Sequence, residues 1–389
     1  MPTVPQRILT THVGSLPRSQ AVVDLLARKE GGAPYDAAQF DGTLSNAVRE
    51  IVARQRASGV DVVSDGEQSK PSYATYIKDR LSGFSGHSKA MRGADLDEFP
   101  QYLARLMSRR GAAIKLARPC CTGPIAVKDR APLTADLRRF RAALDAAGIT
   151  QGFMNAASPG VIAVFQPDQY YGSPERYLGA LADAMQDEYR SIIEAGFILQ
   201  IDCPDLAMGR HLSFKHASDE EFLHHAAAQV EALNAALAGL PAERMRLHLC
   251  WGNYEGPHHR DIPLEKLFAI VMRAAPQALL FEAANPRHAH EWRVFAERKH
   301  EIPSDKILIP GVISSTSNYI EHPEWIAQRI CTFADIVGRE RVMAGSDCGF
   351  STFAGDGLVD PDICFAKLRS MAQGAAIATQ RLWAHPTNA

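Results

Sequence analysis

At 389 residues, with 46% hydrophobic and 22% charged residues, the chain has the size and composition of an ordinary globular protein of one or two domains. Its 42 basic and 44 acidic residues leave a net charge of -2, which gives no electrostatic reason to expect nucleic acid or an anionic membrane as partner. No apolar run approaches the roughly 18 residues of a membrane helix, and the start of the chain lacks the charged and apolar regions of a signal peptide.

Short apolar runs alternate with long helical patterns through most of the chain. Eight of these runs are predicted strands, over residues 8–15, 60–67, 113–124, 197–204, 245–252, 278–285, 307–314 and 341–348. Several of the intervening helical patterns begin with Ser or Pro and end at Gly, as helices commonly do. Strands that alternate with helices form parallel βαβ units, so the pattern predicts an α/β fold consisting of a single (β/α)8 TIM barrel.

Two segments depart from this simple alternation. Residues 158–165 form a ninth apolar run, which we interpret as an extra element between the third and fourth strands, although it could replace one of the eight. Residues 68–112 are too long for a simple βα connection. We expect them to form a helical insertion near the barrel mouth, after the second strand. The absence of repeats and long linkers favours one domain over residues 1–389.

Four residues with metal-binding side chains follow predicted strands: His248, Cys250, Glu282 and Cys348. His248 and Cys250 are two positions apart, so on a strand their side chains point to the same face. The carboxyl ends of parallel strands meet at the mouth of a barrel, where such enzymes keep their catalytic groups. One imidazole, two thiolates and one carboxylate are a plausible set of zinc ligands.

The alternative interpretation is that these cysteines are buried structural residues, as we expect of Cys120, Cys121, Cys203, Cys331 and Cys364. Seven cysteines in a long chain do not resemble a disulfide framework, so we expect a cytoplasmic protein with free thiols. Three strand ends that offer His, Cys, Glu and Cys are hard to explain by packing. Ligands spread over three strands favour a catalytic zinc, which could bind and deprotonate an external thiol, over a structural zinc held by closely spaced loops.

At these residues the chain resembles the cobalamin-independent methionine synthase family, specifically its catalytic carboxyl-terminal barrel. The similar segments are THVGSLPRS (11–19), SDGE (64–67), TGP (122–124), QIDCP (200–204), HLCWGN (248–253), FEAANP (281–286), PGV (310–312) and GSDCG (345–349). The resemblance implies that the four residues above are zinc ligands. It also implies that Ser15, Glu67 and Asp202 hold the amino-acid part of homocysteine, Glu67 and Asp202 being the catalytic carboxylates.

The implied activity is zinc-dependent methyl transfer to a small-molecule thiol, as in methionine biosynthesis, with 5-methyltetrahydropteroyltriglutamate as the family's methyl donor. The chain departs from the family's pattern in three respects. The full-length synthases have a second, amino-terminal barrel that helps to bind folate, for which this chain has no room. Cys203 replaces an acidic residue, and residues 314–318 (SSTSN) replace a segment with an Asp and a His that is thought to act as general acid. A single-barrel relative such as the epoxyalkane:coenzyme M transferases, with another thiol and electrophile, is therefore the nearest alternative.

The segment that follows Cys250 adds candidates for substrate binding, Trp251 and Asn253, although a solvated loop is an equal alternative. We do not expect His258 and His259 to share a metal ion. We expect His288 and His290 to lie at the surface. Weaker candidates are substrate contacts for Lys70, Tyr73 and Tyr76, and an anion contact for Arg18. A non-catalytic, zinc-stabilised barrel is an alternative of another class, and decarboxylation, as in the related porphyrin-processing barrels, would not need His248, Cys250 and Cys348 together. The oligomeric state is left open.

Overall fold

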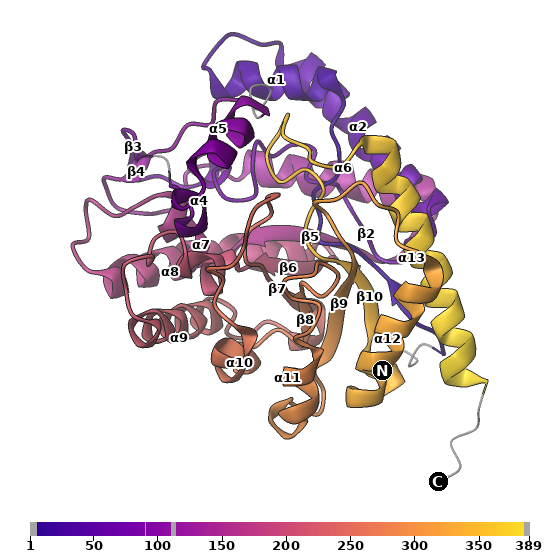
Figure 1. The fold of residues 1–389 in the computed structure, drawn as a ribbon. Coiled ribbons are helices and arrows are strands. Elements are labelled where there is room, and N and C mark those ends of the chain that lie inside the picture. Colours follow the sequence, from indigo (N-terminus) through magenta and orange to yellow (C-terminus); the bar gives the residue numbers. More distant parts are fainter. Residues whose placement is uncertain (1–5, 90, 110–113, 385–389) are drawn as a thin grey trace.

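The computed structural model describes residues 6–89, 91–109 and 114–384. Within these ranges, eight parallel strands form one sheet in the order β1-β10-β9-β8-β7-β6-β5-β2 (Figure 1). The strands are β1 (Leu9–Thr10), β2 (Val63–Ser64), β5 (Gly152–Ala157), β6 (Ile198–Asp202), β7 (Met245–Leu249), β8 (Ala278–Phe281), β9 (Ile307–Ile313) and β10 (Met343–Ser346).

The two edges of this sheet meet, so that the sheet closes into a barrel. The backbone N–H groups of Asp61 and Val62, just before β2, donate to the carbonyl of Thr10 in β1, at 3.1 and 3.0 Å. The hydroxyl of Thr11 donates to the carbonyl of Val62 at 2.9 Å. Closure removes the exposed edges that an open sheet would leave.

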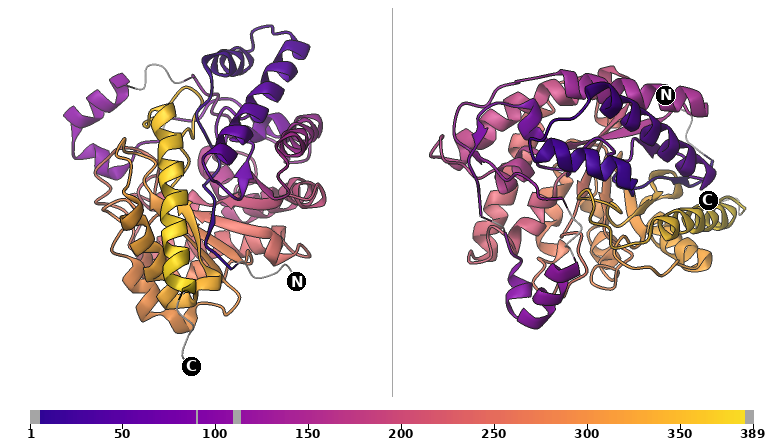
Figure 2. Two further views of the ribbon diagram at one scale, coloured as in Figure 1. Left: turned by 90° about the vertical axis from the view of Figure 1, so that its right-hand side faces the viewer. Right: turned by 90° about the horizontal axis from the view of Figure 1, so that it is seen from above.

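Helices surround the strands on the outside of the barrel, as the view from above shows (Figure 2). They are α2 (Ala37–Ala57), α6 (Ala131–Ala147), α8 (Pro174–Glu194), α9 (Asp219–Ala236), α10 (Leu264–Met272), α11 (Trp292–Glu297), α12 (Pro323–Val337) and α13 (Pro361–Trp383). Helix α1 (Gln20–Glu30) lies beyond the ends of the strands, at the top of Figure 1. Helix α8 is typical: Ser173 caps its first turn, and Leu181, Met185, Tyr189 and Ile192 recur at helical spacing on its buried face. The predicted TIM barrel is confirmed.

The third strand of the barrel is not the one predicted from sequence. It is β5, at residues 152–157, and the predicted strand 113–124 contributes only β4 (Cys120–Cys121), which pairs antiparallel with β3 (Phe84–Ser85) outside the barrel. Residue 113 lies outside the described residues. The ninth run, 158–165, is instead a helix, α7 (Pro159–Phe165), because the hydroxyl of Ser158 caps it by accepting from the Val161 N–H at 2.9 Å.

The long segment after β2 contains three helices in its described part: α3 (Ile77–Arg80), α4 (Ala94–Asp97) and α5 (Pro100–Arg109). Helices α4 and α5 lie beside the barrel mouth (Figures 1 and 2). Polar contacts fix them to the loops after β6 and β7. The Ala94 N–H donates to the His211 carbonyl at 2.9 Å, Lys215 Nζ donates to Asp97 at 2.9 Å, and the Tyr254 hydroxyl donates to Asp95. The predicted helical excursion is thus confirmed. No helix in the described ranges combines the length and apolarity needed to cross a bilayer.

Candidate active site

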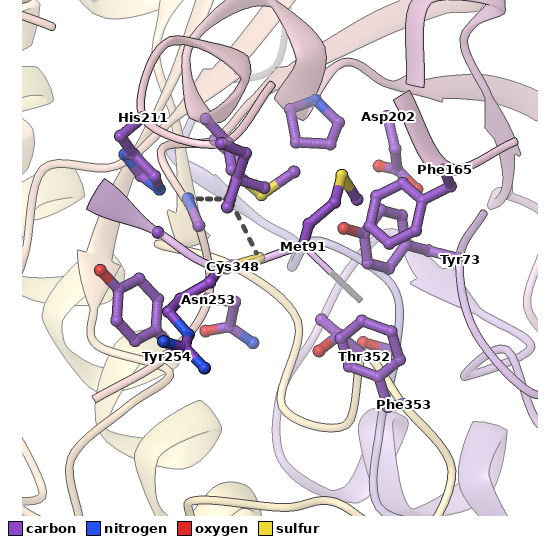
Figure 3. A pocket seen from close by; sticks show the side chains of 18 of the residues that line it. Tyr73, Met91, Phe165, Asp202, His211, Asn253, Tyr254, Cys348, Thr352 and Phe353 are labelled. Carbon is purple, nitrogen blue, oxygen red and sulfur yellow. Dashed lines mark hydrogen bonds between the residues drawn. The ribbon is translucent and has the colours of Figure 1, made fainter. Parts of the chain in front are cut away.

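Three of the four predicted metal ligands meet at the mouth of the barrel. His248 is in β7, Cys250 directly follows that strand, and Cys348 follows β10. One ligand atom from each lies within 4.8 Å of the other two, the only such His/Cys/Asp/Glu group among the described residues. The two sulfur atoms are 3.6 Å apart, and Figure 3 shows Cys348 at this point. Two thiolates bound at about 2.3 Å to one tetrahedral zinc would lie about 3.8 Å apart, so this pair fits such an ion.

The thiols of Cys250 and Cys348 differ in their pKa. The hydrogen bond with Cys250 lowers the pKa of Cys348 to about 6, despite burial. The same hydrogen bond, together with burial, raises the pKa of Cys250 well above its ordinary value. At neutral pH, and without a cation, the pair therefore holds one proton between two sulfur atoms, and a bound cation would favour loss of that proton.

The imidazole of His248 is oriented by Asp202, the last residue of β6, which lies opposite His248 in the neighbouring strand. His248 Nδ1 lies 3.2 Å from an oxygen of Asp202, while its buried Nε2 has no hydrogen-bond partner among the described residues. A carboxylate on one ring nitrogen leaves the other nitrogen available as a metal ligand. Asp202 thus stands behind a candidate ligand, whereas the sequence predicted that it holds the amino-acid end of the substrate. It also lines the cavity described below, and its substrate role stays a prediction.

Sequence reasoning missed the residues that hold Asp202. Asn155 and Gln200 donate to its two oxygens at 2.9 and 2.8 Å. Arg246 Nε in turn donates to the side-chain carbonyl of Gln200 at 2.7 Å, and its guanidinium lies 3.5 Å from the ring centre of Phe153. The available signal was strand alternation: Arg246 precedes His248 by two positions, and Gln200 precedes Asp202 by two.

Glu282, the fourth predicted ligand, is buried next to this group but does not join it. Its two oxygens accept from the backbone N–H of Trp251 at 2.8 Å and from Asn285 Nδ2 at 2.7 Å. Burial raises the pKa of Glu282 to about 7. Its role as a metal ligand stays a prediction, and it would require the carboxylate to exchange one of these partners for the ion.

A cavity of about 340 Å³ opens above the His248, Cys250 and Cys348 side chains, and Ser15 and Glu67 line it as well. The Ser15 hydroxyl and one oxygen of Glu67 are buried and have no hydrogen-bond partner within the described part of the chain, which is uncommon for polar atoms in a folded protein. Glu67 has a φ of 52°, a strained conformation for a residue other than Gly. Burial raises the pKa of its carboxyl to about 7. A ligand with hydrogen-bond donors would satisfy both atoms.

The remaining candidates divide between the cavity and the protein framework. Asn253 and Tyr73 line the cavity. Trp251 does not, since it is fully buried, stacks on His288 at 4.2 Å and donates to the Ile262 carbonyl. Arg18, Lys70 and Tyr76 are also used internally: Arg18 and Lys70 donate to backbone carbonyls, and the Tyr76 hydroxyl donates to Glu188.

The histidine predictions were partly wrong. His288, expected at the surface, is buried against Asp261, whereas His290 is exposed as expected. His258 contacts the same carboxylate at 2.9 Å, and His259 lies 3.1 Å from Glu98. These two neighbouring histidines thus have separate partners.

A model of the family described as the catalytic domain of cobalamin-independent synthase matches residues 85–376. The chain belongs to this family. The cobalamin-independent synthases are methyltransferases, so the predicted family and the broad class of enzyme are confirmed.

Known relatives are similar over almost the whole chain. A methionine synthase of Saccharolobus solfataricus is 23% identical over 379 residues, which cover 96% of this chain and 95% of the relative. A methionine synthase of Sulfurisphaera tokodaii is 22% identical, with 96% of this chain and 93% of the relative covered.

Two solved structures share the fold of this cobalamin-independent synthase family member. A B12-independent methionine synthase from a Shewanella species, solved in complex with selenomethionine, has a TM-score of 0.72 at 17% identity, covering 97% of this chain and 100% of that chain. A putative B12-independent methionine synthase of Listeria monocytogenes has a TM-score of 0.65 at 18% identity, with 95% and 98% covered.

Proposed function

We propose that this protein is a zinc-dependent thiol S-alkyltransferase that transfers a methyl group to a homocysteine-like thiol. The observation that carries the proposal is the His248, Cys250 and Cys348 group, whose ligand atoms lie within 4.8 Å of one another. The unpartnered polar atoms of Ser15 and Glu67 line the same cavity. A site for a metal and a site for the polar end of a small molecule would thus lie side by side.

His248, Cys250 and Cys348 would hold the zinc ion, with Glu282 as a replaceable fourth ligand. Zinc at such a site favours the thiolate form of a bound thiol at neutral pH. Ser15 and Glu67 would hold the polar groups of the amino-acid end of the substrate. Asp202 would keep the His248 ring in place. The selenomethionine bound to the Shewanella relative is consistent with an amino-acid ligand of this kind.

In the reaction, the substrate sulfur releases its proton to solvent and attacks the alkyl carbon of the donor. The new sulfur–carbon bond forms as the bond between that carbon and the donor breaks, and the electron pair leaves with the donor. Enclosure of both substrates in one cavity would accelerate this step mainly through proximity and orientation. Residues 314–318 supply no acid or imidazole for the departing group, so a donor that leaves without protonation is the second candidate. An epoxide-type electrophile is included: its ring C–O bond would break, no group would depart, and the resulting alkoxide would take its proton from solvent.

The proposal predicts that Cys250→Ser and Cys348→Ser each lose zinc and activity together, because two thiolates supply most of the negative charge at the site. Zinc content would be measured by mass spectrometry of the purified protein, and activity by the mass of the alkylated thiol. Cys331→Ser, on the outer helix α12, is the matched control and should keep both. A zinc-free variant with full activity would refute the mechanism.

X-ray absorption at the zinc edge separates the enzyme from a non-catalytic, zinc-stabilised barrel. Addition of homocysteine should introduce a new sulfur ligand at an open catalytic site. A closed structural site would give an unchanged spectrum. A panel of thiols combined with methyl-folate, methylcobalamin and epoxide donors would then identify the pair of substrates.

A further inference from the structure

The residues that line the cavity above the candidate metal group fall into two unlike sets. One set, here called the barrel side, is the polar and sulfur-containing side chains described above. The other, here called the apolar wall, consists of Leu96, Leu103, Leu106, Phe165, Met208 and Leu212. Figure 3 shows Met91, Phe165, Tyr73 and Phe353 gathered around the same space.

The apolar wall comes from separate parts of the chain that polar contacts hold together. Leu96, Leu103 and Leu106 belong to α4 and α5, whereas Phe165 ends α7 and the other two residues follow β6. The contacts of Ala94 with His211, and of Asp97 with Lys215, anchor α4 to the segment that carries Met208 and Leu212. The apolar wall is therefore formed by several elements of the fold around the cavity, and not by the apolar face of a single surface helix.

The cavity is larger than a small amino-acid thiol needs. Its volume of about 340 Å³ falls within the roughly 300–1,000 Å³ of pockets that enclose drug-sized ligands. An amino acid held by Ser15 and Glu67 with its sulfur at the cysteines would occupy the barrel side. The apolar wall would remain in contact with whatever approaches that sulfur.

The charges of the cavity do not suit a donor with several carboxylates. Two arginines line it, and one of them, Arg92, lies 3.7 Å from Asp97. Among the described lining residues, Arg118 is the one arginine that no carboxylate contacts. A folyl triglutamate would bring several carboxylates to this surface, and carboxylates that lose water without gaining partners bind poorly.

On the basis of the proposed function, we infer that the alkyl donor has an uncharged or singly charged apolar body, which packs against the apolar wall while its reactive carbon faces the substrate sulfur. Burial of hydrocarbon against Leu103, Leu106 and Phe165 supplies the affinity. The polar barrel side selects the thiol, and the apolar wall selects the donor.

The test uses the zinc-loaded, full-length protein and S-alkyl homocysteines with methyl, butyl, hexyl and benzyl groups, which span both sides of the cavity. Calorimetry should give dissociation constants that fall about 2- to 4-fold for each added methylene, up to hexyl. Leu106→Asn should weaken binding of the hexyl compound at least 10-fold and leave that of the methyl compound within about 2-fold. Ala104→Asn, on the exposed face of the same helix, is the matched control and should change neither. If Leu106→Asn does not fold, Leu103→Asn replaces it.

An uncharged fluorescent probe, N-phenyl-1-naphthylamine, tests the apolar wall without the amino acid. Its fluorescence should rise on binding in the wild-type and Ala104→Asn proteins, and fall at least 5-fold in Leu106→Asn. If the probe binds in this manner while no S-alkyl homocysteine binds, the apolar wall stands and the proposed thiol is wrong. If affinity is independent of chain length and the probe binds equally to all variants, the inference is overturned, even when S-methyl homocysteine binds.

Discussion

A buried cation, the guanidinium of Arg246, lies in the barrel below the candidate site, and no carboxylate of the described residues contacts it. Arg246 is 2% exposed, and it donates to Gln200, to the Thr11 hydroxyl at 2.9 Å and to the His12 carbonyl at 2.8 Å. Burial lowers the pKa of its guanidinium to about 9, against the attraction of Asp202. Arg246 holds the side-chain carbonyl of Gln200, and the amide nitrogen of Gln200 then donates to Asp202 and to the Val13 carbonyl. We infer that Arg246 positions the Asp202 carboxylate that contacts His248.

Arg246→Met should therefore weaken zinc binding although no ligand is changed. Without its partner, the Gln200 side chain is free to rotate away from Asp202. Loss of such contacts behind a metal ligand typically lowers metal affinity by about 10- to 100-fold. Competition with a chelating dye would measure the change. Arg244→Met, at a half-buried position outside the barrel, is the control. A variant that is less stable but binds zinc with unchanged affinity would contradict this role.

The residue pattern was sufficient to predict that His248, Cys250 and Cys348 lie together, because strand alternation and strand ends determine their direction. The partners of Glu282 could not be predicted in this way. One of them is the backbone N–H of Trp251, and every residue except Pro has such a group, so no side-chain pattern indicates which one a buried carboxylate will choose.

At the scale of elements, one carboxylate connects three loops of the barrel mouth. Asp261, after β7, lies 2.9 Å from His211 after β6, 2.9 Å from His258 and 3.0 Å from His288 after β8. Burial lowers the pKa of His288, but its hydrogen bonds with Asp261 and Glu291 outweigh burial and raise it to about 10. The pKa of Asp261 is lowered in spite of burial by its three histidine partners.

Asp261→Asn should lower the free energy of unfolding by about 3–5 kcal/mol near pH 6, because it leaves buried, protonated histidines without their counter-charge. A histidine with a raised pKa contributes its full stabilisation below its unfolded pKa of about 6.5 and loses it as pH rises toward 10. The loss measured by urea unfolding should thus be smaller at pH 9 than at pH 6. Glu98→Gln, at an exposed contact of His259, is the control. An equal loss at both pH values would contradict the charged state of the cluster.

The third strand marks the limit of prediction for elements. The observed strand, GFMNAA, has no β-branched residue, whereas residues 113–124 include Ile114 and Thr122. Burial within the barrel overrides this preference, since strand propensity depends on context. Gly152 starts the strand where a Cβ would lie 2.6 Å from the ring of Phe140. The Ser158-Pro159 pair was the usable signal, because it marks a helix start.

At the scale of the whole molecule, the barrel depends on a seam between its first two strands. Asp61 accepts from the backbone N–H of Thr10 at 2.9 Å and from both terminal nitrogens of Arg7 at 2.8 Å. On the other side, β1 pairs with β10, Leu9 with Met343 and Thr10 with Ala344. The first strand thus connects the beginning and the end of the sheet.

Asp61→Ala should lower the free energy of unfolding by about 1–2 kcal/mol, because the Thr10 N–H loses its acceptor at the seam. Guanidinium unfolding followed by circular dichroism would measure it. Asp362→Ala removes an exposed ion pair with Arg54 and should change stability by less than about 0.5 kcal/mol. Equal effects of the two substitutions would show that the seam does not need Asp61.

The position of Cys348, 98 residues after Cys250, has a consequence for the order of events during synthesis. A growing chain that has reached β9 already contains His248 and Cys250, but it lacks both the third candidate ligand and the strand that joins β1. Strand β10 and Cys348 are synthesised together, within residues 343–348. Tight metal capture would thus be reserved for a finished barrel, and an interrupted chain would be left without it.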